Sequence, residues 1–190
     1  AVTRSAVPAL IEALKDKEKY VRILAANALE KIGPKAAEAV PALIVALKDK
    51  ALSVRNTAVS ALGKIGQGAE KAVSRSVVTA LIQTLKGKDE DVRGGAANAL
   101  SQLGPKAEKA VPALIEALKD KESGVRWSAA IALGKIGSKA ERAVPALIEA
   151  LKDKDKYARC EVAFALWKIT TKTEKAVPVL IKALKDKESG

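Results

Sequence analysis

The side chains that could do chemistry in this 190-residue chain are suited to binding and poorly suited to catalysis. The sequence contains no histidine, the commonest general base, proton shuttle and metal ligand in proteins. Its single cysteine, Cys160, therefore has no histidine to activate it, and no group of residues has the spacing of metal ligands. We expect a protein that is not an enzyme and that requires no cofactor.

The residues best suited to contact a partner are the aromatic ones: two Trp, two Tyr and one Phe. They lie at offsets −2, +1, +5 and +8 from an arginine that recurs after Val or Ala. At about 100° per residue these offsets fall on one arc of a helix, opposite the small aliphatic positions. Because Trp and Tyr are enriched in binding hot spots, we predict that this arc binds a protein or peptide. The predicted partner-binding residues are Tyr20, Ile23, Asn27, Trp127, Ile131, Tyr157, Cys160, Phe164 and Trp167.

The same rings have a second interpretation, in which they fold onto neighbouring helices and fill gaps. Trp167 stands where two other repeats have Gly63 and Gly134, so this ring could instead cover an end of the array. The two interpretations differ in the effect of truncating the rings, because truncation of a core side chain lowers stability strongly.

A second candidate surface is a row of lysines in short KDK-like segments. The net charge of +12 could attract a phosphate backbone to this row, so nucleic acid is the alternative partner. The aromatic residues do not interleave with these lysines, which favours a solvated edge partly neutralised by acidic neighbours. The row consists of Lys17, Lys50, Lys88, Lys121, Lys154 and Lys187, accompanied by Lys15, Lys48, Lys86, Lys119, Lys152 and Lys185.

A tandem repeat positions these residues. The block AVPALIEALKDK occurs three times without change, starting at Ala6, Ala110 and Ala143. The recurring arginines are 33, 38, 33 and 33 residues apart, and a fixed period of this length is typical of a solenoid. We predict one domain with repeats at 1–33, 34–66, 67–104, 105–137 and 138–170 and a partial repeat at 171–190.

Each repeat is predicted to contain two helices. The first opens with a proline, which a helix tolerates in its first turn; these prolines are Pro8, Pro41, Pro112, Pro145 and Pro178. In the first repeat the second helix is predicted from about Tyr20 to Ile32. A glycine with left-handed backbone is predicted to end each second helix. The glycines with this predicted role are Gly33, Gly66, Gly104 and Gly137.

The order of Pro, LIxALxD and VRxxAAxALxxI resembles the HEAT repeat, especially the HEAT-like repeats of phycobilisome lyases and of artificial proteins built from them. The resemblance covers essentially the whole chain and implies an all-α fold, a right-handed α-solenoid of helix pairs. It also implies a ladder of charge-assisted hydrogen bonds between repeats, made by an Asp and an Arg that recur in register. These residues are Asp16 with Arg22, Asp49 with Arg55, Asp120 with Arg126 and Asp153 with Arg159. No bilin-binding motif is present, so the resemblance carries over as fold alone.

In stacked helix pairs the second helices line the inner wall, so the aromatic arc is expected to form a concave groove, strongest over the fourth and fifth repeats. DNA glycosylases on HEAT-like scaffolds use a concave Trp and an acid. The acids on this arc are few, namely Glu30 and, at its margin, Glu161, which disfavours that function. A structural or engineered array without a ligand is a further alternative.

The third repeat departs from the pattern. Five extra residues precede its first helix, Thr79 replaces the proline, and Gly87 replaces the ladder Asp. Gly94 and Gly95 follow its arginine, and an interior Gly costs about 1 kcal/mol relative to Ala in a helix. We predict that this repeat is the least stable one and forms a bend.

The composition bounds the remaining possibilities. No run approaches 18 uninterrupted apolar residues, so we expect no membrane span. A single cysteine and the absence of a signal-peptide pattern suit a cytoplasmic protein. The lack of Met suggests a fragment or an engineered sequence. The last predicted helix, Val177–Lys185, has no second helix to cover it, which predicts head-to-tail self-association.

Overall fold

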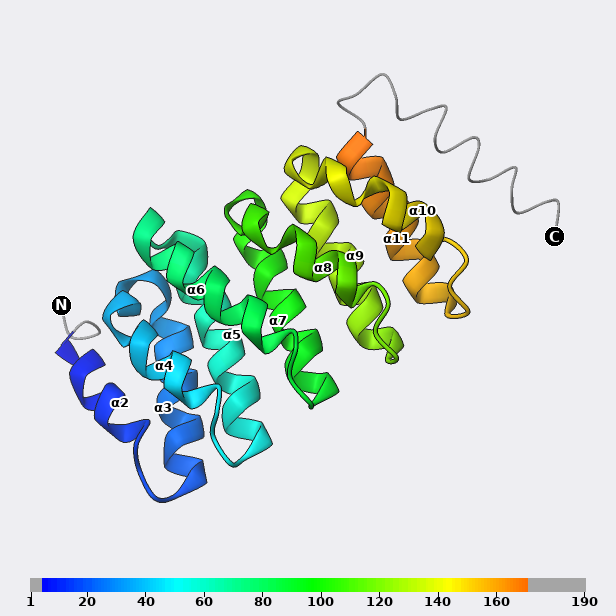
Figure 1. Cartoon of the computed structure of the whole chain (residues 1–190). Helices are drawn as coiled ribbons and strands as arrows, with labels where there is room; N and C mark the ends of the chain where they lie inside the picture. Colours follow the sequence, from blue (N-terminus) through cyan, green and yellow to red (C-terminus); the bar gives the residue numbers. More distant parts are fainter. Residues whose placement is uncertain (1–4, 171–190) are drawn as a thin grey trace, which may run out of the picture.

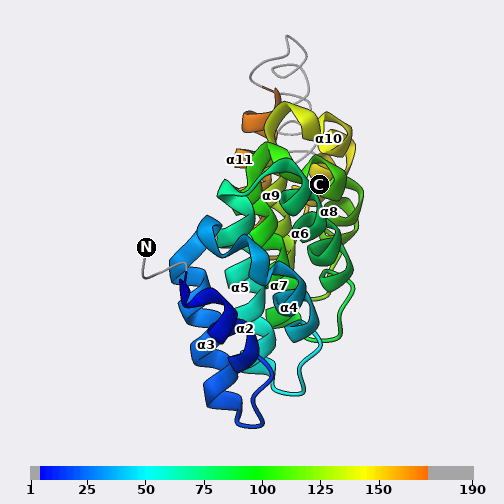
Figure 2. The same cartoon turned by 90° about the vertical axis from the view of Figure 1, so that its left-hand side faces the viewer.

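The computed structural model of the chain describes residues 5–170, and all regular elements in that range are helices. The helices stack side by side from one end of this range to the other (Figure 1), and the view turned by 90° shows them in two layers (Figure 2). The predicted fold class, an all-α solenoid of helix pairs, is confirmed. The predicted helix Val177–Lys185 and the partial repeat lie outside the described residues.

The chain alternates between the two layers. The first helices of the pairs are α2 (Val7–Ala13), α4 (Val40–Ala46), α6 (Lys71–Thr84), α8 (Val111–Ala117) and α10 (Val144–Ala150). The second helices are α3 (Lys19–Ile32), α5 (Leu52–Gly68), α7 (Glu90–Leu103), α9 (Ser123–Ile136) and α11 (Lys156–Thr170). As predicted, a proline lies in the first turn of α2, α4, α8 and α10.

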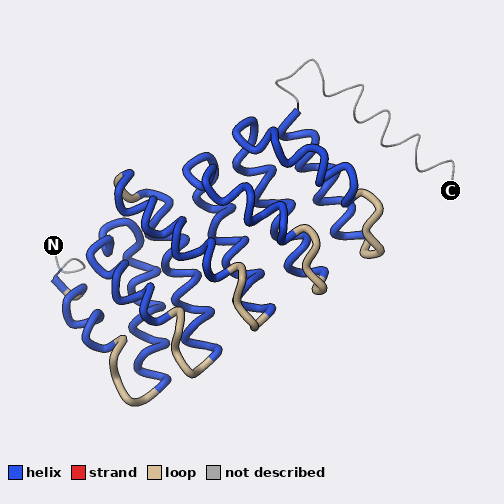
Figure 3. The backbone as a smooth tube through the Cα atoms, viewed as in Figure 1, coloured by secondary structure: helices blue, strands red, loops and turns tan. Residues whose placement is uncertain are grey.

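The connections run along two opposite edges of the solenoid. The KDK turns are the loops that follow one edge in Figure 3. At the other edge a 3-10 helix leads into the next pair: η1 (Gly33–Ala39), η2 (Gly104–Ala110) and η3 (Gly137–Ala143). Each begins at a glycine with positive φ, 64° at Gly33, 54° at Gly104 and 71° at Gly137. The helix-ending role and the positive φ predicted for these three glycines are confirmed, but their ψ values of −138°, −131° and −142° differ from the left-handed helical conformation. Glycine adopts this backbone without steric cost.

The prediction that Gly66 ends a helix was wrong. Gly66 lies inside α5, which continues to Gly68, and its φ is not positive. The extra residues of the third repeat extend α5 by a turn and let α6 begin at Lys71. Gly66 lies in a closely packed region instead, because a Cβ there would lie 2.8 Å from Leu103 Cδ2 and 3.1 Å from Val77 Cγ1, so these side chains would have to shift to admit it.

The core consists of small aliphatic side chains. In every described second helix the Ala or Val at offset +3 and the Leu at offset +7 are buried. The second helices approach each other closely at two glycines. A Cβ on Gly63 would lie 2.8 Å from Ala99 Cβ, and a Cβ on Gly134 would lie 3.1 Å from Ala165 Cα. These seams fix the spacing of the layer that carries the aromatic residues.

An Arg–Asp ladder also holds successive repeats in register. Arg93 donates from two nitrogens to both carboxylate oxygens of Asp120, at 2.7 and 2.9 Å, and from its third to two carbonyl oxygens of its own turn. Burial opposes ionisation of Asp120, but the hydrogen bonds from Arg93 and from the Glu122 backbone N–H outweigh it and lower the pKa of the carboxyl group. The same bidentate contact joins Arg22 to Asp49 and Arg126 to Asp153. The ladder between repeats is confirmed.

The third repeat keeps this ladder in altered form. Gly87 stands at the ladder position, and Arg55 instead donates through one nitrogen to Asp89, two residues later, at 2.6 Å. The side chain of Asp89 is 44% exposed, against 13% for Asp120. Exposed, single-contact ion pairs contribute less than bidentate, desolvated ones. This weaker rung supports the expectation of a less stable third repeat, which stays a prediction.

Candidate binding face of the second helices

The outward positions of the second helices form one surface, here called the second-helix face. It comprises four rows, at offsets −2, +1, +5 and +9 from the repeated arginine, together with Trp167 at offset +8 of α11. In row order its members are Tyr20, Ser53, Asp91, Gly124 and Tyr157; Ile23, Asn56, Gly94, Trp127 and Cys160; Asn27, Ser60, Asn98, Ile131 and Phe164; and Lys31, Lys64, Gln102, Lys135 and Lys168. Because one helix supplies one residue to each row, the rows cross the helices.

The aromatic side chains avoid the core. Their exposed fractions range from 40% at Trp127 to 66% at Tyr20. Cys160 is also exposed, whereas Ile23, Asn27 and Ile131 are half-buried. The rings therefore lie on the surface as expected from their offsets, and their role in binding stays a prediction.

The predicted residues fall into two groups. Tyr20, Ile23 and Asn27 belong to α3, near one end of the described range, and the others belong to α9 and α11 at the opposite end (Figure 1). Helices α5 and α7 lie between the groups. The group on α9 and α11 contains the Phe and both Trp residues, so it is the stronger candidate site.

Ring and cation contacts order the aromatic side chains of α11. The ring centroids of Phe164 and Trp167 are 5.5 Å apart with planes tilted by 35°, a geometry that aromatic pairs favour. Lys168 Nζ lies 5.2 Å from the Phe164 centroid and 5.4 Å from that of Trp167. At these distances the ammonium group is attracted to both rings. The three side chains form one preorganised cluster.

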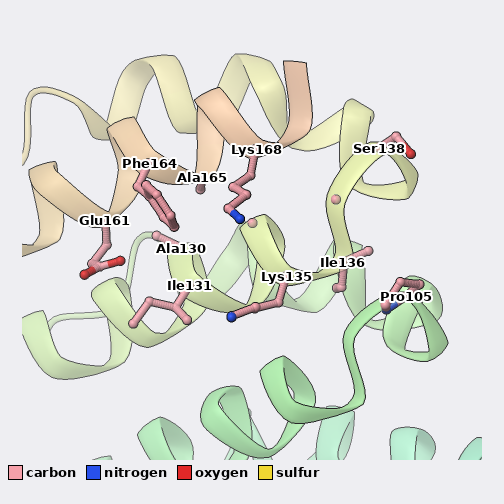
Figure 4. A pocket seen from close by; sticks show the side chains of 12 residues that line it. Pro105, Ala130, Ile131, Lys135, Ile136, Ser138, Glu161, Phe164, Ala165 and Lys168 are labelled. Atoms are coloured by element: carbon pink, nitrogen blue, oxygen red, sulfur yellow. The ribbon is translucent and has the colours of Figure 1, made fainter. Parts of the chain in front are cut away.

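A groove of about 440 Å³ lies beside this cluster, between α9 and α11 (Figure 4). The small buried residues Ala130, Gly134 and Ala165 of the helix seam make its floor. Ile131 and Phe164 form its walls, and Lys135, Lys168 and Glu161 lie at its rim. The groove can accept an apolar side chain next to cationic groups.

A smaller hollow of about 280 Å³ lies between α7 and α9 and is bordered by Trp127. Gly94 and Gly95 contribute no side chains to it, and Glu90 and Asp91 line it as well. Trp127 therefore borders open space and is 40% exposed, and the choice between binding and packing roles for this ring stays a prediction.

The offset +8 behaves differently from the other aromatic offsets. Gly63 and Gly134 at this offset are buried against the next second helix. Glu30, also at +8, accepts a hydrogen bond at 2.7 Å from Ser60 of the next helix. The expectation that residues at offset +8 lie on the same exposed arc as those at −2, +1 and +5 was wrong for these three residues, because each faces its neighbouring second helix. Trp167 has the same offset and is nonetheless 49% exposed.

The lysines at offset +9 are candidate functional residues that the sequence interpretation missed. Lys31, Lys64, Lys135 and Lys168 are exposed on the second-helix face, one turn beyond the +5 row. Their recurrence directly before an Ile in four of the five described repeats was the available signal. Offset +9 holds Lys in four of the five described repeats and Gln102 in the third, so it varies less than the predicted binding offsets.

The turn lysines of the alternative surface lie in the turns that join the first and second helices of each pair. The second Lys of each described turn, from Lys17 to Lys154, is exposed. Where a ladder rung is complete, the Asp between the two lysines of the turn accepts hydrogen bonds from a ladder arginine. Lys185 and Lys187 lie outside the described residues. Nucleic-acid binding along this edge stays an alternative.

Within residues 5–170 no group of three or more His, Cys, Asp or Glu side chains could hold a metal ion. In the same range no helix combines the length and the apolar character needed to span a bilayer.

Comparisons with known proteins agree with this geometry. The family model of HEAT repeats matches residues 7–75 and 78–166. A search of curated proteins finds no match. Among solved structures, the complex of CpcE and CpcF of phycocyanin lyase from Nostoc sp. PCC7120 is 30% identical in sequence. The match covers 95% of this chain and 69% of that chain, with a TM-score of 0.71.

Two further structures are designed or engineered proteins. An engineered protein of the Northeast Structural Genomics Consortium is 25% identical over 93% of this chain and 86% of that chain, with a TM-score of 0.73. A designed armadillo repeat protein in complex with peptide (KR)4 is 21% identical over 87% of this chain and 82% of that chain, with a TM-score of 0.69, which shows a likeness of fold alone. Because the repeat model covers most of the chain and the helix pairs and ladder accompany it, this chain belongs to the HEAT-repeat family.

Proposed function

We propose that this chain is a non-catalytic binding module that captures a protein or peptide segment on its second-helix face. One observation carries the proposal: the buried hydrophobic side chains of the described residues are all aliphatic, and all five aromatic side chains are exposed on the second helices. Exposed aromatic residues of this kind mark interaction sites in soluble proteins. The glycine seams draw the second helices together, which favours this layer as the inner side of the stack.

Two of the similar structures support the same class of function. One is a complex of two phycocyanin lyase chains, and the other is a designed repeat protein with a bound peptide. Each of these two proteins is in a complex with another polypeptide. For this chain we place the strongest contacts on α9 and α11, where the groove adjoins the Phe164–Trp167 pair.

The test is a selection of binding peptides from a displayed random library, followed by affinity measurements on variants. The double variant Trp127→Ala/Phe164→Ala removes two rings that are each about half exposed. Burial of the remaining area contributes about 1 kcal/mol per ring, so the double variant should weaken binding by more than about tenfold. Peptides that bind the double variant as tightly as the native chain would contradict the proposal.

The matched control is Val45→Ala, which removes an exposed aliphatic side chain from α4 in the other layer. This variant should bind the selected peptides with native affinity. Binding can also be followed by intrinsic fluorescence, because the two Trp residues of the chain, Trp127 and Trp167, both lie on the second-helix face.

A further inference from the structure

The groove between α9 and α11 combines apolar and cationic groups in a fixed order. Ile131 and Phe164 of the +5 row wall it, and Lys135 and Lys168 of the +9 row lie at its rim. Four residues along a helix correspond to about 6 Å of rise, so the two rows are parallel stripes one helical turn apart. Figure 4 shows Lys168 extending from α11 toward α9 and Lys135 extending from α9 toward Ile131.

The cationic stripe continues along the stack beyond the groove. Lys31 and Lys64 extend it over α3 and α5, and Gln102 is its uncharged member on α7. The row contains no acidic residue. Lys31, Lys64 and Lys135 form no ion pair with another residue of the range 5–170. These ammonium groups therefore lack an anionic partner within the described chain.

The ligand that satisfies both stripes must carry acidic and apolar groups on opposite sides. An extended peptide has this property when the two kinds of side chain alternate, because successive side chains point to opposite sides of an extended backbone. Its carboxylates would face the +9 lysines, and its apolar side chains would face Ile131 and Phe164. The carboxylates of the peptide are expected beside the lysines and away from Glu161, because Glu161 also lines the groove and its carboxylate would repel them.

We propose that the second-helix face recognises an extended acidic segment in which Asp or Glu alternates with large apolar residues, lying between the +5 and +9 rows so that it crosses α9 and α11 and places an apolar side chain in their groove. This inference rests on the proposed function and specifies the chemistry of the partner. The net charge of +12 would accelerate the encounter with such a segment. The apolar walls favour a peptide over a nucleic acid, whose backbone presents charge on every residue.

The experiment uses two labelled eight-residue peptides, one alternating Glu with Leu and one alternating Lys with Leu, titrated with the native chain by fluorescence anisotropy. We expect the acidic peptide to bind at least tenfold more tightly and to weaken as salt rises. The variant Lys135→Gln/Lys168→Gln should lose roughly tenfold in affinity for the acidic peptide, as expected for two partly exposed ion pairs. The charge reversal Lys135→Glu/Lys168→Glu should transfer the preference to the basic peptide.

The matched control is Lys17→Gln/Lys50→Gln, which removes the same charge from the turn edge and should leave the affinity within about twofold. Three results would overturn the inference: equal binding of both peptides, no binding of the acidic peptide, or loss of binding in the control variant alone. Displacement of the acidic peptide by single-stranded DNA at lower concentration than by unlabelled peptide would also overturn it. If charge has no effect but Phe164→Ala weakens binding of selected peptides, the proposed function stands and only this inference fails.

Discussion

The glycines of the second helices provide a test of the packing that supports the site. Gly94 lies inside α7, and a Cβ added there would come no closer than 3.9 Å to Gly124 O and 4.0 Å to Val125 Cγ2. Space is therefore open, and Gly94→Ala should stabilise the chain by about 0.5–1 kcal/mol, because alanine loses less backbone entropy in a helix.

Gly63 is the matched position with the opposite expectation. A Cβ there would lie 2.8 Å from Ala99 Cβ and 3.0 Å from Ala99 Cα, so backbone must move to admit it. Overpacking of this kind costs about 1–3 kcal/mol, which exceeds the gain in helix propensity. We expect Gly63→Ala to destabilise the chain by about 1 kcal/mol.

Thermal denaturation followed by circular dichroism measures both effects. For a chain of this size about 1 kcal/mol corresponds to roughly 2–4 °C. Gly94→Ala should therefore raise the Tm by a few degrees, and Gly63→Ala should lower it. If both variants raise the Tm equally, the seam between α5 and α7 is not as tight as described here and the reasoning is refuted.

Three further predictions concern stability. Trp127→Ala and Phe164→Ala should each cost no more than about 1 kcal/mol, because only about half of each ring is buried, whereas Leu133→Ala in the core should cost about 2–5 kcal/mol; a comparable loss for all three would mean that the rings are structural. Amide exchange should be fastest in α6 and α7, since the third repeat has the exposed ladder rung and the glycine pair, and uniform protection along the chain would contradict this. Because folding lowers the pKa of Asp120, the unfolded chain binds a proton at this carboxylate at higher pH than the folded chain does. The contribution of the Arg93–Asp120 pair to the free energy of unfolding is therefore present above about pH 4 and is lost as the pH falls below it. Urea denaturation between pH 6 and pH 2 should show that loss, and Asp120→Asn should reduce the slope; an unchanged slope would exclude the Arg93–Asp120 rung as a cause.

The sequence was sufficient to predict the helix pairs, because the repeat places Pro, the aliphatic stripe and Gly at constant spacing. The predicted role of Gly66 was wrong, because the inserted residues allow α5 to continue past it. Gly66 packs closely against Val77 and Leu103 and does not end a helix. A glycine in the sequence does not reveal whether it serves a turn or a close contact. The three-dimensional neighbours settle which requirement applies.

The candidate site was only partly predictable for a related reason. Helical periodicity gave the exposure of Tyr20, Trp127 and Phe164 correctly, because exposure opposite an aliphatic stripe depends on the helix alone. It could not show that offset +8 faces the next second helix, since that depends on how the helices stack. It also passed over Lys135 and Lys168, whose constancy between repeats made them resemble structural residues.

The central claim is that the partner lies on the second-helix face, and mapping of backbone amide chemical shifts in the presence of a selected peptide tests it most directly. The account predicts that the shifted amides lie at the −2, +1, +5 and +9 rows, with the largest changes on α9 and α11. Shifts confined to the first helices or to the turn edge would contradict it.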